Sequence, residues 1–598
     1  MNIRSLRLNL TSARDILLKY RYHLLALAVL MIWCTPYFMT GDKINWGDFS
    51  FFAQGYEAIR VSILEYHQFP WWNPWMAGGI PLYANPQLGV FSIQTLLVFI
   101  FGAPFGLKMA VILYMILGYA SMYLLLSRYF RVKQVTAILL SLVWILSSFF
   151  VAHMPSHFTF VWYMLAPLFV HLSLLVNNWK TGLLFGGAFA VMALSAVHNP
   201  FFQIGLVCAI IILFRFMFIA LKRKDELKNF IVGLAAGAGL FVIIAGHRVF
   251  LAYQNVSSFD RGIVNDPPNS LWSTVLAILL PFSRDQYHSP HNPYPGAPFS
   301  WGEATSSMGA VATILAVALL AYFLFILIKK KPAKRYSLFK KQQWVILSLV
   351  FITLFFVALG SGNHGPDSPY FYLKHLPVFG EMRVSTRWLL WSTAALIVLI
   401  GVIATLIKNR KATLLINCVL GLGVLELFFL NFGYQYDILS KTPIEAPKAT
   451  SEYSFTQIDE FGSLHKLSNG TVIPDDGVGP QFYREYEATT YNIGVVRANE
   501  PLINNRWIGV RPVEDKGVPF VLSKNASVTY WSPNKIILKR TKPGPITLNI
   551  NESNYIKING VRFDTDHVAD TSKNLGIYVS DETQEITITM SPDYVSSE

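Results

Sequence analysis

The sequence predicts a helical integral membrane protein that crosses the bilayer about eleven times and carries a β-rich domain at its C-terminal end. Of its 598 residues, 53% are hydrophobic and only 14% are charged, whereas soluble domains carry about 25% charged residues. Apolar runs long enough to cross about 30 Å of hydrocarbon recur as far as the segment before Tyr434. Beyond that residue the composition is that of a water-soluble domain. The composition therefore predicts one part of the chain in lipid and another in water.

The membrane domain is predicted to cover residues 22–432, after a basic N-terminal tail of residues 1–21. The first apolar run lacks a small-residue cleavage site, so we interpret it as a retained signal anchor. Two apolar stretches, 88–101 and 271–282, are too short to cross and are expected to be interfacial or re-entrant helices. The predicted spans are 22–38, 107–126, 135–151, 158–175, 183–197, 201–221, 230–250, 308–328, 344–359, 388–407 and 413–430.

The basic residues predict the orientation of these spans. With the N-terminus in the cytoplasm, the six cytoplasmic segments hold 23 Lys and Arg, and the longer outer segments before the C-terminal domain hold seven. This distribution follows the positive-inside rule. An odd number of spans then places residues 433–598 outside the cytoplasm. The net charge of +14 is largely a topological signal, and no nucleic-acid partner is needed to explain it.

Most of the irregular and polar sequence lies on the outer side, in loops 39–106, 251–307 and 360–387 and in the C-terminal domain. Long ordered loops usually carry function, so we expect the protein to act at the outer surface of the bilayer. Short β-branched runs separated by turn signals predict that the C-terminal domain is a β-sandwich. Carbohydrate binding and a structural cap both remain open as its role.

The first outer loop holds the most informative carboxylate, Asp48. Such a group can act as a general base on an acceptor hydroxyl, or it can cap the helix that follows. From the residue alone, capping is the simpler interpretation. The next segment, from Phe51 to Tyr66, is predicted to be an amphipathic helix with Glu57 and Glu65 on its solvated face.

A proline- and tryptophan-rich stretch, residues 69–86, follows in the same loop. Its four Pro, three Trp and two adjacent Gly exclude a helix and predict a rigid surface at headgroup depth. An aromatic belt that anchors the loop in the membrane interface explains these residues. Stacking of the rings on sugar faces explains them equally well.

Outer arginines form the second group of candidates. Arg261 follows the seventh span, and Arg383 and Arg387, four residues apart, would share one face of a helix. The planar guanidinium matches phosphate because it donates two parallel hydrogen bonds. The competing explanation is an ordinary salt bridge, for example to Glu381 or Asp367.

Other polar residues give weaker signals. Arg248 lies in an apolar run, so it should face protein or a wet cavity and have a partner. His153, His157 and His198 lie near outer helix ends without carboxylate or Cys clusters at metal-ligand spacing, and we interpret them as buried or capping residues. The three Cys lie in separate apolar runs and are interpreted as packing residues. The sequence has no P-loop, dinucleotide fingerprint or nucleophile elbow.

Several motifs together point to a known family. Gly47-Asp48 follows the first span, Trp72-Asn73-Pro74 and Gly79-Ile80-Pro81-Leu82 lie in the first outer loop, and Met382-Arg383-Val384-Ser385-Thr386-Arg387 precedes the tenth span. In these motifs, and over most of its length, the chain resembles the bacterial YfhO-like membrane proteins, a family similar to the C-type (GT-C) glycosyltransferases. The family's Gly-His-Pro-Gln-like stretch appears here as residues 197–203, and a second catalytic acid is not evident.

The resemblance implies an enzyme of the bacterial cytoplasmic membrane that moves a sugar from a polyprenyl-phosphate carrier to an extracytoplasmic acceptor. Asp48 matches the acidic residue that such enzymes use as catalytic base. Arg261, Arg383 and Arg387 match the positions that hold the lipid phosphate, and His364 is a further candidate.

In the same comparison the first outer loop is a substrate loop, with Trp72, Asn73 and Asn85 as its candidate contacts. The implied partners are the lipid-linked sugar, membrane lipids and a cell-envelope glycan or glycoprotein acceptor. The residues indicate no cofactor and no metal site, although the resemblance admits a divalent cation.

Two rival functions remain at this stage. A transporter or flippase of lipid-linked glycans needs ionisable residues at mid-membrane depth and often internal repeats, and the sequence offers little of either beyond Arg248 and Glu426. A non-catalytic scaffold would use the C-terminal domain to bind envelope glycans.

Overall fold

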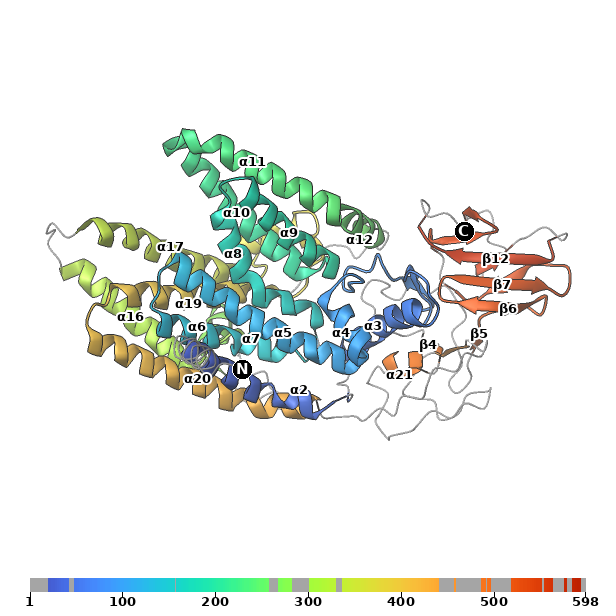
Figure 1. The fold of residues 1–598 in the computed structure, drawn as a ribbon, viewed down its shortest axis with the longest axis horizontal. Helices are drawn as coiled ribbons and strands as arrows, with labels where there is room; N and C mark the ends of the chain where they lie inside the picture. Colours follow the sequence, from blue (N-terminus) through green and yellow to red (C-terminus); the bar gives the residue numbers. More distant parts are fainter. Residues whose placement is uncertain are drawn as a thin grey trace, which may run out of the picture.

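The computed structural model describes most of the membrane domain and parts of the C-terminal domain. The described residues are 20–41, 43, 48–155, 157–257, 267–281, 301–329, 336–439, 456–458, 485–490, 492–495, 518–550, 553–562, 575–577 and 583–592. The molecule is elongated, with a helical bundle at one end and a β-sheet at the other (Figure 1). Helices α3 and α21 lie between these two parts.

The described residues form nine helices that are long and apolar enough to cross a membrane. They are Ala103–Tyr129, Gln134–His153, Phe158–Leu175, Asn199–Lys222, Lys224–Val256, Ala310–Ile328, Gln342–Gly360, Ser385–Leu406 and Arg410–Phe432. Two shorter apolar helices, Tyr20–Trp33 and Trp179–Ser195, lie at the first and fifth predicted spans. The prediction of a polytopic helical membrane protein is therefore confirmed.

The individual elements of the bundle follow in chain order. They are α2 (Thr35–Met39), α3 (Asp48–Leu64), α4 (Ile93–Phe101), α5 (Ala103–Leu124), η1 (Leu125–Tyr129), α6 (Gln134–Ile145), α7 (Ser148–His153), η2 (Phe158–Leu165), α8 (Ala166–Leu175), α9 (Trp179–Ser195), α10 (Asn199–Lys222), α11 (Lys224–Phe241), η3 (Val242–Gly246), α12 (His247–Ser257), α13 (Leu271–Leu279), α15 (Trp301–Ala304), α16 (Ala310–Lys329), α17 (Tyr336–Gly360), α18 (Pro369–Lys374), η4 (Phe379–Glu381), η5 (Ser385–Trp388), α19 (Leu389–Leu406) and α20 (Arg410–Leu439).

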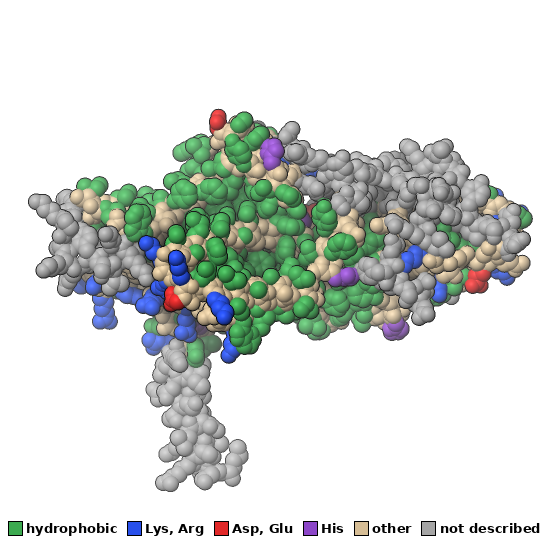
Figure 2. All heavy atoms as spheres, turned by 90° about the horizontal axis from the view of Figure 1, so that it is seen from above, with side chains coloured by type: hydrophobic (Ala, Val, Ile, Leu, Met, Phe, Trp, Pro, Cys, Tyr) green, Lys and Arg blue, Asp and Glu red, His purple; other side chains and the backbone are tan. Residues whose placement is uncertain are grey.

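The outer surface of the bundle is apolar. The exposed fraction is 66% for Phe214 on α10, 85% for Ile328 on α16 and 73% for Phe429 on α20. Hydrophobic side chains cover much of the molecule's middle in Figure 2. A soluble monomer rarely exposes so large an apolar surface, whereas lipid hydrocarbon solvates it well. Lys and Arg gather at the end of the bundle away from the β-sheet (Figure 2).

Helices α4 and α13 correspond to the two apolar stretches that were expected not to cross. Each contains nine residues, which at 1.5 Å per residue is about half the thickness of the hydrocarbon. The structure therefore agrees that neither spans the membrane.

The prediction of an amphipathic helix from Phe51 to Tyr66 is wrong in one respect. The helix forms, as α3, but it is buried almost all round, and Glu57 is only 6% exposed. Helices α4, α5 and α21 pack against it. Arg60 donates hydrogen bonds to both carboxylate oxygens of Glu57 there, at 2.7–3.0 Å. The Glu65 carboxylate also forms an ion pair with Arg60, and the Glu65 side chain is 40% exposed.

Residues 69–86 are non-helical, as predicted, and contain a short hairpin of β1 (Trp72–Asn73) and β2 (Ile80–Pro81). The stretch does not form an exposed aromatic surface, because Trp72 is 0% and Trp75 is 2% exposed. The Nε1–H of Trp75 donates to the side chain of Asn492 at 2.8 Å. Backbone hydrogen bonds join Ala77 and Trp75 to Val495 in β4 at 2.7 and 2.9 Å. The C-terminal part of the chain thus covers the loop.

The C-terminal domain contains an antiparallel sheet in the order β10-β9-β12-β7-β6. Its strands are β6 (Ala526–Ser532), β7 (Lys535–Arg540), β9 (Ile556–Ile558), β10 (Val561–Arg562) and β12 (Glu585–Met590). Two smaller sheets pair β8 (Ile546–Leu548) with β11 (Leu575–Ile577), and β3 (Thr456–Ile458) with β4 (Ile493–Val495) and β5 (Val518–Pro519). The β-rich prediction is confirmed, and a sandwich remains a prediction.

The turn between β6 and β7 ties this sheet to the first outer loop. The Asn534 side chain accepts a hydrogen bond from the backbone N–H of Trp72 at 3.2 Å and donates to the carbonyl of Phe69. The α21 helix (Glu485–Thr490) packs on α3, where the N–H of Tyr486 donates to Ser50 at 3.3 Å. These contacts join the C-terminal domain to the loop and to α3, and both roles considered for the domain, a structural cap and carbohydrate binding, stay predictions.

Helices α9 and α11 pack closely through glycines spaced four apart. A Cβ atom on Gly182 would overlap the carbonyl of Gly233, and one on Gly186 would overlap the carbonyl of Gly237. Small residues at this spacing allow backbones to touch, which is how membrane helices gain packing energy without a hydrophobic driving force.

We therefore expect Gly186→Ala to push α9 away from α11 and destabilise the protein by about 1–3 kcal/mol, seen as a lower midpoint of thermal unfolding in detergent. Gly187→Ala is the matched control, since a Cβ at Gly187 would make only an ordinary contact with Leu240 at 3.5 Å. Equal midpoints for the two variants would contradict the proposed close packing.

Candidate functional site

A cavity of about 430 Å³ is lined by residues of α3, α10, α12, α15 and η5 and of the segments that precede η2 and α10. Its lining contains both polar and apolar side chains. The polar lining residues include Asp48, His157, His198, Glu303, Arg383 and Arg387. The apolar lining residues include Phe51, Phe52, Val197, Phe202, Val249, Ala252, Tyr253 and Val256, from α3, the start of α10 and α12.

Asp48 is the first residue of α3 and contacts His157, which directly precedes η2. The His157 Nε2 lies 2.8 Å from Oδ2 of Asp48, and the exposed fractions of the two side chains are 23% and 33%. A helix N-terminus favours a carboxylate, so the capping interpretation and a place in the cavity are both compatible with this position. The sequence predicted the location of Asp48 but not its partner.

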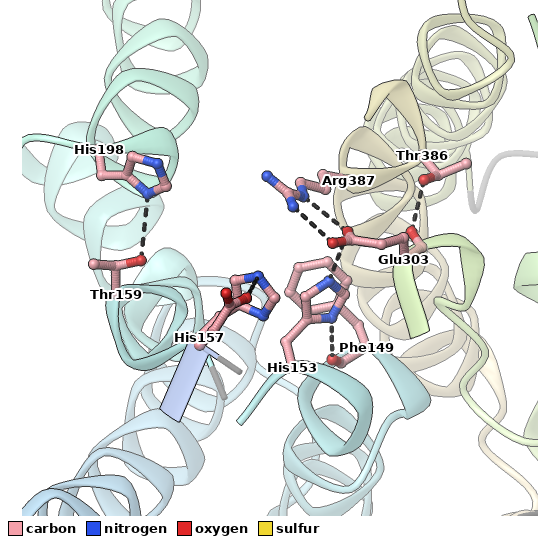
Figure 3. A network of polar contacts seen from close by, with 9 residues as sticks. Phe149, His153, His157, Thr159, His198, Glu303, Thr386 and Arg387 are labelled. Atoms are coloured by element: carbon pink, nitrogen blue, oxygen red, sulfur yellow. Dashed lines mark hydrogen bonds and ion pairs between the residues drawn. The ribbon is translucent and has the colours of Figure 1, made fainter. Parts of the chain in front are cut away.

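The second acidic residue of the cavity is Glu303, on the short helix α15. Arg387 donates to it from Nε at 3.0 Å and from Nη2 at 2.8 Å, which is a bidentate pair. His153 Nε2 lies 3.3 Å from the same carboxylate, and Thr386 donates to the backbone carbonyl of Glu303 at 2.6 Å. Figure 3 shows these side chains converging from separate elements.

This pairing decides how much of Arg387 remains for a ligand. Two of its three nitrogens face Glu303, and its Nη1 has no hydrogen-bond partner among the described residues. The guanidinium also lies over the Phe160 ring, 4.8 Å from the centroid. In Figure 3 one nitrogen of Arg387 points away from Glu303. Arg387 can thus offer one donor while its charge is largely compensated.

The charges of this network shift two pKa values in opposite directions. Burial opposes ionisation of Glu303, but the Arg387 charge and the hydrogen bond from His153 outweigh it and hold the pKa of Glu303 well below its usual value. Burial also opposes the charged form of His157. The Asp48 carboxylate outweighs that effect and raises the pKa of His157.

Aromatic rings hold the histidines in place. The His157 ring stacks on Phe160 with centroids 5.0 Å apart and an angle of 17° between the ring planes. The ring centroids of His198 and Phe160 are 6.2 Å apart, and the Nδ1 of His198 is 3.3 Å from the hydroxyl of Thr159. The orientation of the His157 ring toward Asp48 is thus set by η2.

Arg383 lines the cavity as an exposed cation and has no ion-pair partner within the part of the chain that the structure describes. The expectation that Arg383 and Arg387 share a helix face is wrong. The helix begins only at Ser385, since Val384 has φ +58° and breaks the run. Val378, at the other end of this segment, has φ +72°. Such φ values are strained for β-branched residues and often occur at functional sites.

The other predicted donor-binding residues are placed differently. Arg261 lies outside the described residues. His364 is exposed and makes a hydrogen bond to the carbonyl of Ser361 at 3.1 Å, away from the cavity lining. The sequence had offered Glu381 or Asp367 as salt-bridge partners for the arginines, and the structure pairs Arg387 with Glu303 instead.

The structure does not bring the predicted substrate-loop residues to the cavity. Trp72, Asn73 and Asn85 are each 0% exposed and are absent from its lining. The Asn73 side chain exchanges hydrogen bonds with Gln54 at 2.9 and 3.1 Å. Pro86, which directly follows Asn85, does line the cavity.

Arg248 joins this segment to α12. It is 0% exposed, and its Nη2 donates to the backbone carbonyls of Asn85 and of Leu88, the latter at 2.7 Å. Its guanidinium lies 5.3 Å from the Tyr83 ring centroid. The sequence predicted that Arg248 would have a partner, and its partners are two backbone carbonyls and an aromatic ring. Arg248 thus connects α12 to the segment that contains Asn85 and Leu88.

Two residues of the site were not recognised as functional from the sequence. His157 had been assigned to capping or packing, and Glu303 had not been singled out. The signal for Glu303 was its position: it is the one carboxylate in residues 301–309, the apolar, small-residue segment directly before a span. Glu303 is the second carboxylate, beside Asp48, among the described residues that line the cavity.

A divalent cation does not fit the side chains that the structure describes. Among them no group of three or more His, Cys, Asp or Glu side chains could hold a metal ion. The Glu303 carboxylate is engaged on both oxygens by Arg387.

No family model matches the sequence, and no curated protein is similar to it. The chain is similar to the cryo-EM structure of the arabinofuranosyltransferase AftD from Mycobacteria, with 11% identity over 80% of this chain and a TM-score of 0.42. It spans about a third of AftD, since 32% of that chain is covered.

Two further solved structures are similar to this chain. One is ArnT from Cupriavidus metallidurans bound to undecaprenyl phosphate, with 14% identity, a TM-score of 0.34, and coverage of 72% of this chain and 83% of ArnT. The other is the Archaeoglobus fulgidus oligosaccharyltransferase in complex with Zn and sulfate. Its identity is 13%, its TM-score is 0.35, and the coverage is 70% of this chain and 54% of that one.

The low pKa of Glu303 predicts how its contribution to stability depends on pH. A carboxyl group with a depressed pKa stabilises the folded state above its unfolded-state value, here about 4.5, and this contribution is lost as the pH falls through the folded-state pKa. We expect Glu303→Gln to destabilise the protein at pH 7 by about 3 kcal/mol, because Arg387 loses its counter-charge in a buried site.

The difference in thermal midpoint between this variant and the wild type should shrink below about pH 4.5. Glu226→Gln, at an exposed helix start, is the control and should show no such pH-dependent difference. A Glu303→Gln difference that stays constant from pH 7 to pH 3 would be inconsistent with an ionised, paired Glu303.

Proposed function

We propose that this chain is a membrane glycosyltransferase that moves a sugar from a polyprenyl-phosphate carrier to a hydroxyl acceptor outside the cytoplasm. Asp48 is its general base. The observation that carries the proposal is the composition of a single cavity: it combines a partly exposed carboxylate, an exposed arginine and an apolar wall of membrane helices. These are the three chemical features that such a reaction needs.

The apolar wall suits the isoprenoid chain of the carrier. Residues of α12 such as Ala252, Tyr253 and Val256 line the cavity, and Tyr253 is 65% exposed on the outside of the bundle. A hydrocarbon chain can therefore lie against α12 while remaining in contact with the bilayer. A nucleotide-linked donor would gain nothing from this surface.

The two arginines suit the carrier phosphate. Arg383 offers a full guanidinium, and Arg387 offers the one nitrogen that Glu303 does not occupy. Glu303 compensates the charge of Arg387, which leaves the one positive charge of Arg383 for the donor. A phosphodiester with one negative charge matches this balance.

In the reaction, the acceptor oxygen attacks the anomeric carbon of the bound sugar while the bond from that carbon to the phosphate oxygen breaks. The electron pair of that bond goes to the phosphate, and the acceptor proton goes to the Asp48 carboxylate. Holding donor and acceptor in line supplies much of the rate, and the positioned base supplies about 10²–10⁴-fold.

The proposed orientation puts the cavity on the extracytoplasmic face of the bacterial cytoplasmic membrane. Basic residues gather at the opposite end of the bundle (Figure 2), as expected for the cytoplasmic side. The acceptor is then a cell-envelope glycan or glycoprotein, and the C-terminal domain lies beside the cavity on the same side.

We expect Asp48→Asn to lower sugar transfer at least 10²-fold, because the amide cannot take the acceptor proton. The measurement is transfer from radiolabelled polyprenyl-phosphate sugars by the reconstituted protein. Asp367→Asn is the control, since Asp367 is exposed and does not line the cavity. Full activity of Asp48→Asn would remove the proposed base, and label crossing the bilayer without a new glycosidic bond would identify a transporter.

Arg383→Gln should raise the KM for the lipid-linked donor by about tenfold with little change in kcat, because it removes one charge-assisted hydrogen bond worth about 1.5–3 kcal/mol. Arg223→Gln is the control, an exposed arginine that pairs with Glu226 where α10 meets α11. An unchanged KM in Arg383→Gln would exclude this arginine from donor binding.

A further inference from the structure

His157 contacts the proposed base, and the proposed reaction gives it no role. Its Nε2 lies 2.8 Å from Asp48 Oδ2. The His157 ring stacks on the Phe160 ring. A capping carboxylate needs backbone N–H groups as partners, so capping of α3 does not explain a histidine fixed against Asp48.

We infer that His157 and Asp48 form one acid–base unit, in which loss of a proton from His157 makes the Asp48 carboxylate an effective base. This inference rests on the proposed function and adds a positioning residue to it. When His157 is neutral, its Nε2–H orients the carboxylate without cancelling its charge. When His157 is protonated, the carboxylate is held in an ion pair and is a weaker base.

The surroundings of His157 favour this behaviour. The charged or titratable groups that face it are Asp48 from α3, His153 from α7, Glu303 from α15 and Arg387 from η5. Glu303 raises the pKa of His157 and Arg387 lowers it. These two are bound to each other and act on the pKa of His157 in opposite directions. Asp48 remains as the dominant neighbour, and it raises the pKa of His157 against the effect of burial.

Each turnover returns Asp48 and His157 to the protonation states in which they began. The active form has an ionised Asp48 and a neutral His157. The acceptor hydroxyl gives its proton to Asp48, the new bond forms at the anomeric carbon, and the carrier phosphate leaves with the electron pair of the broken bond. Asp48 then releases its proton to water, which restores the starting form.

The inference predicts the pH dependence of transfer. For the wild type, kcat/KM should rise about tenfold per pH unit below the pKa of His157 and level off above it. His157→Gln should abolish this rise, because the glutamine amide can still donate to Asp48 but does not titrate. His157→Phe, which cannot donate, should lower kcat/KM more than His157→Gln does.

His198→Gln is the matched control. His198 also lines the cavity and stacks on Phe160, and its Nδ1 forms a hydrogen bond with the hydroxyl of Thr159. The rise with pH should persist in this variant. A rise that persists in His157→Gln, or that disappears in His198→Gln, would overturn the inference.

A second measurement does not depend on activity. Proton titration of ring-labelled histidines, followed by NMR in detergent, should give His157 a pKa above the usual 6.5, and Asp48→Asn should lower it. An unchanged His157 pKa in Asp48→Asn would refute the pair even if transfer is observed. If no transfer is found but the pKa falls as expected, the acid–base pair stands and the proposed reaction fails.

Discussion

The pairing of each acidic side chain of the cavity with a basic one is the interaction on which the rest of the site depends. Asp48 contacts His157 and Glu303 contacts Arg387, so four separate segments meet at one point. In a site bordered by hydrocarbon, an unpaired charge would cost several kcal/mol. The pairs remove that cost while leaving Arg383 and part of the Asp48 carboxylate accessible to a ligand.

The C-terminal domain contributes to this arrangement from a distance. Its α21 helix packs on α3, and Asn534 binds the loop that follows α3. Asp48 begins α3, so the direction in which its carboxylate faces depends on a domain more than 400 residues further along the chain. Arg248 fixes the other end of the loop to α12. The elements that border the cavity are therefore positioned by contacts with one another. The width of the cavity depends on these tertiary contacts and not on any single helix.

The sequence predicted what local physics determines and missed what depends on long-range contacts. Apolar length and basic flanks located the spans, and turn residues excluded a helix at 69–86. The α3 helix was expected to be amphipathic because its polar residues had no visible partner, yet α21 and the Arg60 pair cover them. The spacing of Arg383 and Arg387 suggested a shared helix face, which the positive φ of Val384 prevents. Neighbours in the chain gave no sign that Glu303 would meet Arg387.

The most direct test of this account is an experimental structure of the protein with a polyprenyl phosphate bound. The account predicts the phosphate within hydrogen-bonding distance of Arg383 and of the Nη1 of Arg387, the hydrocarbon chain along α12, and the Asp48 carboxylate facing the position where a sugar would be attached. A phosphate bound elsewhere, or a cavity in which the lipid reaches neither arginine and Asp48 is covered by protein, would contradict it.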